Sequence, residues 1–207
     1  MKQASTVFLA FCSLFATGAL AQKNEITGII GRTFVSNQGI IGSTSFDTNV
    51  HFGKGTTFEI NYARSFLNSP VLSLAFEVPF VLNPDQDLHA APPSPVPQQY
   101  RSFITTPSAR VNVFPDVAFS PWASCGGGVA HFSESSRTVF GLPNTGSTGT
   151  NSGVLQVGAG FDVKVVSRLK LRFEVRDFWS GVPQLNVDTG KSRQHNIFVG
   201  AGIVYRF

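Results

Sequence analysis

The segment from Ile197 to Phe207 has one uniformly apolar face. Counting back from Phe207, every second residue is aromatic or aliphatic, whereas the other face carries Arg206, Gly202 and Gly200. A period of two is typical of a β-strand with two different faces. A strand of about ten residues tilted at roughly 45° crosses the hydrocarbon layer of a bilayer. We therefore expect a membrane-spanning strand whose apolar face contacts lipid.

The first 21 residues have the features of a secretory signal peptide. Lys2 supplies a positive charge, residues 7–16 form a short apolar run, and Ala19-Leu20-Ala21 is a small-x-small cleavage site. We predict cleavage after Ala21, which divides the chain into a signal peptide (1–21) and a single mature domain (22–207). The apolar run is too short to span a membrane as a helix. Strands in a closed barrel are then the remaining way to cross a bilayer.

Seven further segments of about ten residues alternate in the same way. The clearest are residues 57–66, 71–81, 154–165 and 169–178. Glycine and proline blur the pattern in residues 25–35, 102–114 and 118–132. Eight strands in total predict an all-β fold, a single antiparallel up-and-down transmembrane β-barrel.

The connections between these segments alternate in length. Short turns are expected near residues 67–70, 114–116 and 166–168, and long connections at 36–56, 83–101, 133–152 and 180–193. Bacterial outer-membrane barrels combine short periplasmic turns with long extracellular loops in this way. An extra strand pair at residues 46–53 would make ten strands, but it would break the alternation, so we favour eight.

Charged residues fall on the inward faces of these strands. They are Glu59, Glu77, Arg110, Asp162, Lys164, Lys170, Arg172, Glu174 and Arg176. An eight-stranded barrel is only wide enough to be filled by side chains, and charges in such an interior are costly unless they are paired. We therefore predict a lumen filled by a charge network. A narrow porin-like channel lined by the same residues is the alternative.

The histidines give little support to catalysis or metal binding. His51, His89, His131 and His195 lie in four different segments, so we expect no metal site and no cofactor. A lipid A-modifying enzyme would need a histidine beside a serine and an acid. His131 and Ser133 have a suitable spacing, but the sequence defines no acid partner. We therefore expect no catalytic residues, and such an enzyme is the least favoured alternative.

Composition limits the partners. The formal net charge of +4 is mild and spread along the chain, which does not favour nucleic acid. Cys125 would be the one cysteine left after cleavage, so no internal disulfide is expected. The connection 83–101 contains five prolines and could present a stiff segment to an extracellular ligand. We expect a monomer.

The signal peptide, the alternation of short and long connections and the terminal Val204-Tyr205-Arg206-Phe207 together resemble the small outer-membrane β-barrel superfamily. This group includes the transmembrane domain of outer-membrane protein A and the opacity proteins. The resemblance implies an integral protein of the bacterial outer membrane, surrounded by its lipid and lipopolysaccharide, with a structural or surface-interaction role. It also implies that Tyr205 and Phe207 form the signal read by barrel-assembly machinery. Since no peptidoglycan-binding domain follows Phe207, we do not expect a tether to the cell wall.

Overall fold

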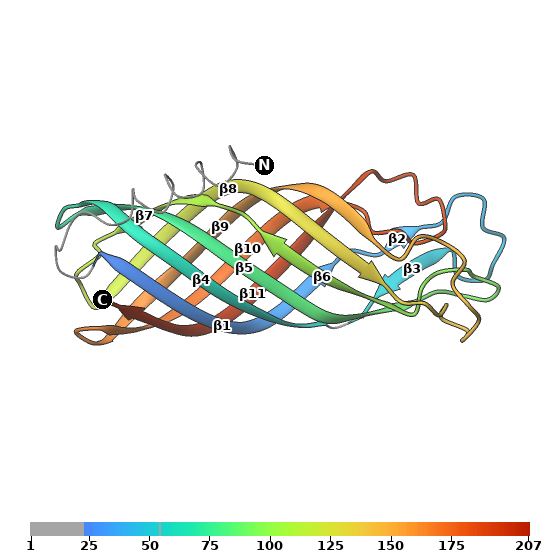
Figure 1. Ribbon diagram of the computed structural model, residues 1–207, viewed down its shortest axis with the longest axis horizontal. Helices are drawn as coiled ribbons and strands as arrows, with labels where there is room; N and C mark the ends of the chain where they lie inside the picture. Colours follow the sequence, from blue (N-terminus) through green and yellow to red (C-terminus); the bar gives the residue numbers. More distant parts are fainter. Residues whose placement is uncertain (1–22, 54) are drawn as a thin grey trace, which may run out of the picture.

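The computed structural model describes residues 23–53 and 55–207, which fold into a closed antiparallel β-barrel (Figure 1). The predicted cleavage site after Ala21 lies outside the described residues. The strands of the described part are β1 (Asn24–Val35), β2 (Gln38–Gly39), β3 (Asn49–Phe52), β4 (Gly55–Asn68), β5 (Leu72–His89), β6 (Gln99–Thr105), β7 (Ser108–Val113), β8 (Phe119–Glu134), β9 (Thr150–Val166), β10 (Leu169–Gly181) and β11 (Arg193–Arg206). A search of the same residues finds no helix that is long and apolar enough to cross a membrane.

Eight strand positions make up the ring. β1 pairs with β4 on one side and with β11 on the other, so the sheet closes on itself. β6 and β7 share one position, because both pair with β5 and β8 and only Thr106 and Pro107 separate them. Pro107 has no N–H to donate to a neighbouring strand, which accounts for the break. The ring confirms the predicted eight-stranded up-and-down barrel.

The short strands β2 and β3 extend the first long connection and add nothing to the ring. They pair with each other, and β3 also pairs with the last residues of β5, where His51 lies opposite His89. The segment 46–53 is therefore part of a loop that folds over the barrel. This arrangement decides between the two strand counts in favour of eight.

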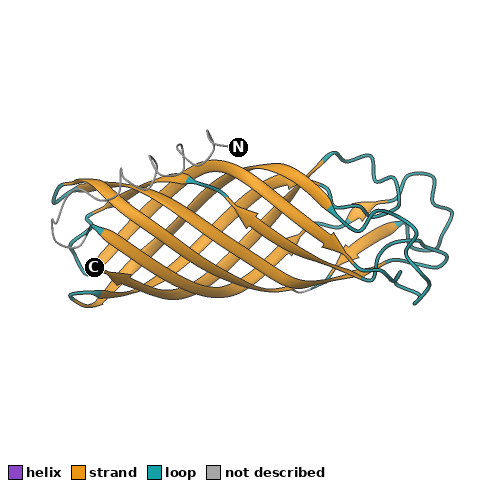
Figure 2. Ribbon diagram, in the orientation of Figure 1, coloured by secondary structure: helices purple, strands orange, loops and turns teal. Residues whose placement is uncertain are grey.

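The connections gather at two ends (Figure 2). Short turns at residues 69–71, 114–118 and 167–168 lie at the end that also holds Asn24 and Phe207, which we call the turn end. The four long connections lie at the opposite end, the loop end.

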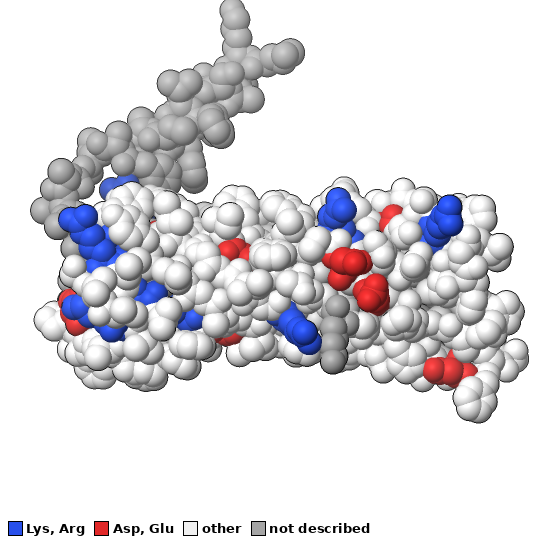
Figure 3. Space-filling view, turned by 90° about the horizontal axis from the view of Figure 1, so that it is seen from below, with Lys and Arg blue, Asp and Glu red and all other residues white. Residues whose placement is uncertain are grey.

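The two faces of the barrel wall have opposite character. Large apolar side chains point outward and are exposed, as at Phe80, Phe173 and Ile203. Inward positions carry buried polar and charged side chains instead. Figure 3 shows that most side chains on the visible wall are neither acidic nor basic. This distribution reverses that of a soluble protein and fits a wall surrounded by lipid.

Candidate functional site

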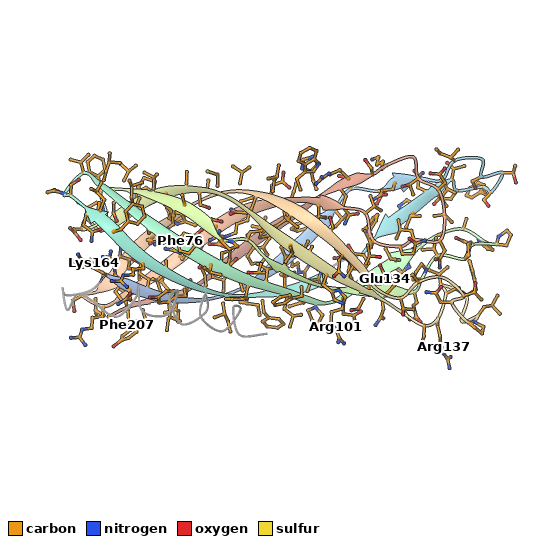
Figure 4. All side chains as sticks on the ribbon, turned by 45° about the horizontal axis from the view of Figure 1, so that its top comes forward. Phe76, Arg101, Glu134, Arg137, Lys164 and Phe207 are labelled. Carbon is orange, nitrogen blue, oxygen red and sulfur yellow. The ribbon has the colours of Figure 1, made fainter. Side chains whose placement is uncertain are left out.

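Inward positions on five tilted strands, β4, β5, β7, β9 and β10, bring together eight of the nine charged residues predicted to face the lumen. Glu59, Glu77, Arg110, Asp162, Lys170, Arg172, Glu174 and Arg176 are all buried. Lys164 is the exception. It lies in register with Lys170 at the turn end, where the side chain reaches solvent and is exposed instead of joining the buried ion pairs (Figure 4).

Arg176 is the centre of one half of the network. Its Nε lies 2.8 Å from Oε1 of Glu174 and 3.4 Å from Oε2 of Glu59. Its Nη1 lies 2.8 Å from Oε1 of Glu77. Glu77 then continues the network, because its Oε2 accepts from Nη1 of Arg110 at 3.2 Å. One guanidinium thus contacts three carboxylates from three strands.

Glu25 joins this half to the turn end of the lumen. It pairs with Nη2 of Arg110, and its Oε2 lies 3.7 Å from Nη2 of Arg172. Arg206 Nε lies 2.8 Å from the other oxygen of Glu25. Glu25 and Arg206 were not among the predicted network residues. Both occupy inward positions near the ends of their strands, two residues from the inward side chains of Thr27 and Val204. This spacing of two along the strand is the signal that could have found them.

Arg172 and Asp162 form a bidentate pair. Nε and Nη2 of Arg172 donate to Oδ1 and Oδ2 of Asp162 at 2.7 and 2.9 Å, a geometry that adds both strength and orientation. Lys170 Nζ lies 4.0 Å from the same carboxylate and donates to the carbonyl of Pro115 at 3.0 Å. The lumen network of the described residues therefore contains five basic and five acidic side chains.

Trp122 lies among the three arginines. The guanidinium carbons of Arg110, Arg172 and Arg176 lie 5.9, 5.1 and 5.2 Å from the centre of its ring. A cation over an indole face is attracted by the ring quadrupole, and more strongly where water is excluded. The sequence did not indicate this residue, because Pro121 and the run Gly126-Gly127-Gly128 blur the alternation of β8.

The loop half of the lumen is closed by apolar side chains. Phe132, Phe178 and Phe198 are fully buried there, and Tyr100 packs edge-on against Phe132 with ring centres 5.7 Å apart. Residues of the loops and strand ends complete this cluster at the loop end. They are Val50, Leu88, Val96 and Leu185. The predicted charge network therefore fills only the turn half, and an apolar cluster together with buried amides such as Gln86, Gln194 and Asn196 fills the rest.

A separate polar cluster lies on the outer wall near the loop end. His131 Nδ1 lies 2.8 Å from Oδ1 of Asn151, and Ser133 Oγ lies 3.1 Å from Nε2 of His131. These three residues come from the neighbouring strands β8 and β9. Among the described residues, no group of three or more His, Cys, Asp or Glu side chains has a spacing suited to a metal ion.

No family model matches the sequence, and no curated protein matches it either. Solved structures do match. Neisserial surface protein A aligns over 91% of this chain and 99% of its own, with a TM-score of 0.57 and 16% identity. Outer membrane protein OprG from Pseudomonas aeruginosa aligns over 92% of this chain and 98% of its own, with a TM-score of 0.53 and 12% identity. The chain has the fold of the small outer-membrane β-barrel superfamily.

This small barrel also aligns with the outer membrane enzyme PagL, over 86% of this chain and 97% of that one, with a TM-score of 0.48 and 14% identity. At these identities the likenesses establish the fold and carry no argument about activity. The fold confirms the resemblance expected from the sequence. The role of the barrel has to be argued from its own lumen, wall and loops.

Proposed function

We propose that this protein is an integral barrel of the bacterial outer membrane with a side-chain-filled lumen and a structural or surface-interaction role. The observation that carries the proposal is the division of the interior between a charge network and an apolar cluster. Three arginines in the network, Arg110, Arg172 and Arg176, are at most 1% exposed. Ions crossing the lumen would have to displace these paired charges and the aromatic cluster around Phe132.

Recognition in such a barrel would reside in the loops, which face the cell exterior when the turn end is periplasmic. One feature favours this reading. The proline segment Pro92–Pro95 and the exposed side chains of Phe140 and Leu142 line a cleft of about 410 Å³ at the loop end. Prolines lose little conformational freedom on binding, so a stiff apolar cleft suits an extracellular ligand.

Conductance of the refolded full chain in planar lipid bilayers tests the closed lumen. Because the interior is filled from both ends, we expect little steady current. Large, stable and ion-selective currents from the wild-type protein would reject the closed lumen and support the narrow porin-like channel. Fractionation of the producing cells tests the location, and recovery outside the outer-membrane fraction would contradict it.

A further inference from the structure

Ser133, His131 and Asn151 form a chain of two hydrogen bonds on the outer wall. In this chain Ser133 has the position of a nucleophile, His131 that of its base and Asn151 that of the group that orients the base. If His131 Nδ1–H donates to the Asn151 oxygen, Nε2 of the same ring is left to accept the hydroxyl proton of Ser133. Both contacts are within the range found for activated nucleophiles. Ser-His-acid and Cys-His-Asn sites share this logic on unrelated folds. Asn151 could not be identified from the sequence as the orienting partner of His131, because the two residues lie on neighbouring strands.

The strands place this chain at the boundary of the apolar band. Outward positions of β8 are apolar or small from Phe119 to Val129, and His131 is the first outward polar side chain after them. Ten residues at about 3.4 Å each, tilted by roughly 40°, rise about 26 Å, which is close to the height of the lipid-facing band of such barrels. Ser133 and His131 therefore lie where the polar part of a lipid meets its acyl chains.

A polar pocket adjoins the serine, lined by one basic side chain, Arg101, and one acidic side chain, the buried Glu134. Arg101 on β6 lies directly opposite Ser133 in the strand register, and Phe103 lies opposite His131. Arg101 and Ser133 both line a pocket of about 290 Å³, and Figure 4 shows Arg101 pointing away from the barrel. A guanidinium is suited to a phosphate group, and the exposed ring of Phe103 is suited to an acyl chain.

We propose that this site hydrolyses an acyl ester of a phosphorylated lipid of the surrounding leaflet. Ser133 Oγ attacks the ester carbonyl carbon while its proton passes to His131 Nε2. The tetrahedral intermediate collapses, the carbon–oxygen bond of the ester breaks, and the leaving alcohol takes the proton from His131. Water then attacks the acyl-serine with His131 as base, which releases a fatty acid and restores Ser133. Arg101 holds the phosphate and so positions the ester.

Fatty-acid release by the refolded full chain tests the activity, with mass spectrometry as the readout. Phosphatidylglycerol vesicles and lipopolysaccharide in mixed micelles are the two substrates, and release from one of them identifies the lipid class. Ser133→Ala and His131→Gln should each lower the rate by roughly 10³-fold or more. His195→Ala is the matched control, because His195 is an exposed wall histidine that contacts Asp177 at 2.6 Å. This control should retain the wild-type rate.

The other two roles have separate readouts. Arg101→Gln should raise KM for phosphorylated lipids with little change in kcat, and should leave hydrolysis of a neutral diacylglycerol unchanged. Asn151→Asp should keep activity, and its carboxylate should move the acidic limb of the pH profile to higher pH, because it favours the imidazolium form of His131.

A fluorophosphonate probe provides a test that does not depend on the chosen lipid. It should label Ser133 in the wild-type protein and should not label this position in His131→Gln. Absence of fatty-acid release from both lipids, together with absence of labelling of correctly folded protein, would overturn the proposal. Such a result would leave the closed lumen and the outer-membrane location unaffected.

Discussion

Arg176 illustrates why the inward charges of this barrel depend on one another. Its guanidinium contacts the carboxylates of Glu174, Glu77 and Glu59 and lies 5.2 Å from the ring centre of Trp122. A buried charge costs several kcal/mol unless it is paired, and removal of one partner leaves the others uncompensated. The network is therefore sensitive to single substitutions, although exchanging whole pairs for apolar residues can be neutral.

Glu77→Ala tests this dependence. Glu77 contacts both Arg176 and Arg110, so its loss leaves two buried guanidiniums with fewer partners. We expect the free energy of unfolding to fall by about 3–5 kcal/mol, measured by urea titration of the refolded protein in lipid vesicles. Asp85→Ala is the control, since Asp85 is an exposed acid on the same strand, and it should change stability by less than about 0.5 kcal/mol. Equal effects of the two variants would contradict a stabilising network.

Gly160→Ala tests the packing around Trp122. A Cβ atom at Gly160 would lie 2.7 Å from Cζ2 of Trp122 and would also meet the carbonyl of Phe173. Overpacking of this kind costs about 1–3 kcal/mol, which the same urea titration can measure. A Cβ at Gly153, on the same strand, meets nothing within 4 Å. Gly153→Ala should therefore be close to neutral, and a Gly160→Ala variant of equal stability would contradict overpacking of this position against the Phe173 carbonyl and the Trp122 ring.

At the scale of the strands, sequence periodicity located all eight positions of the ring but not their full lengths. The connection predicted at residues 83–101 is shorter, because β5 continues to His89 and β6 begins at Gln99. A register shift between Asn83 and Gln86 interrupts the alternation there while the pairing resumes beyond it. The apolar cluster at the loop end was not predicted, since it depends on how the loops fold back, and strand periodicity carries no information about that.

Deletion of Phe207 tests the predicted assembly signal. The backbone of Phe207 exchanges hydrogen bonds with Asn24 at 2.9 and 3.1 Å, and its ring stacks on Tyr205 with centres 6.1 Å apart. The deletion removes the terminal aromatic and part of the closing strand pair, so we expect a several-fold lower amount of folded barrel in the outer-membrane fraction. Phe140→Ala, which removes an exposed loop aromatic, should assemble normally. Normal assembly of the deletion variant would remove the role assigned to Phe207.

At the scale of the whole molecule, the two ends of the barrel are built for different surroundings. The turn end has short connections, with the ion network directly beneath them. The loop end has a lumen closed by apolar residues and connections that pack on one another, as the bridge between Pro97 and Thr138 shows. Asn24, which follows the first described residue, and Phe207 both lie at the turn end. If the fold is inserted like other barrels of its class, the loop end faces the exterior.

Protease treatment of intact cells tests this orientation. Exposed loop tips are the preferred sites of cleavage, so we expect cuts within residues 90–95 and 146–149. Val96 should be protected because it is buried and its carbonyl accepts from the N–H of Val139. The turns at 69–71, 114–118 and 167–168 should be cut only after the outer membrane is permeabilised, which is the control for their intrinsic susceptibility. Cleavage of those turns in intact cells, with both loop segments spared, would show the opposite orientation. The proline-lined cleft would then lie in the periplasm, where it could not meet an extracellular ligand.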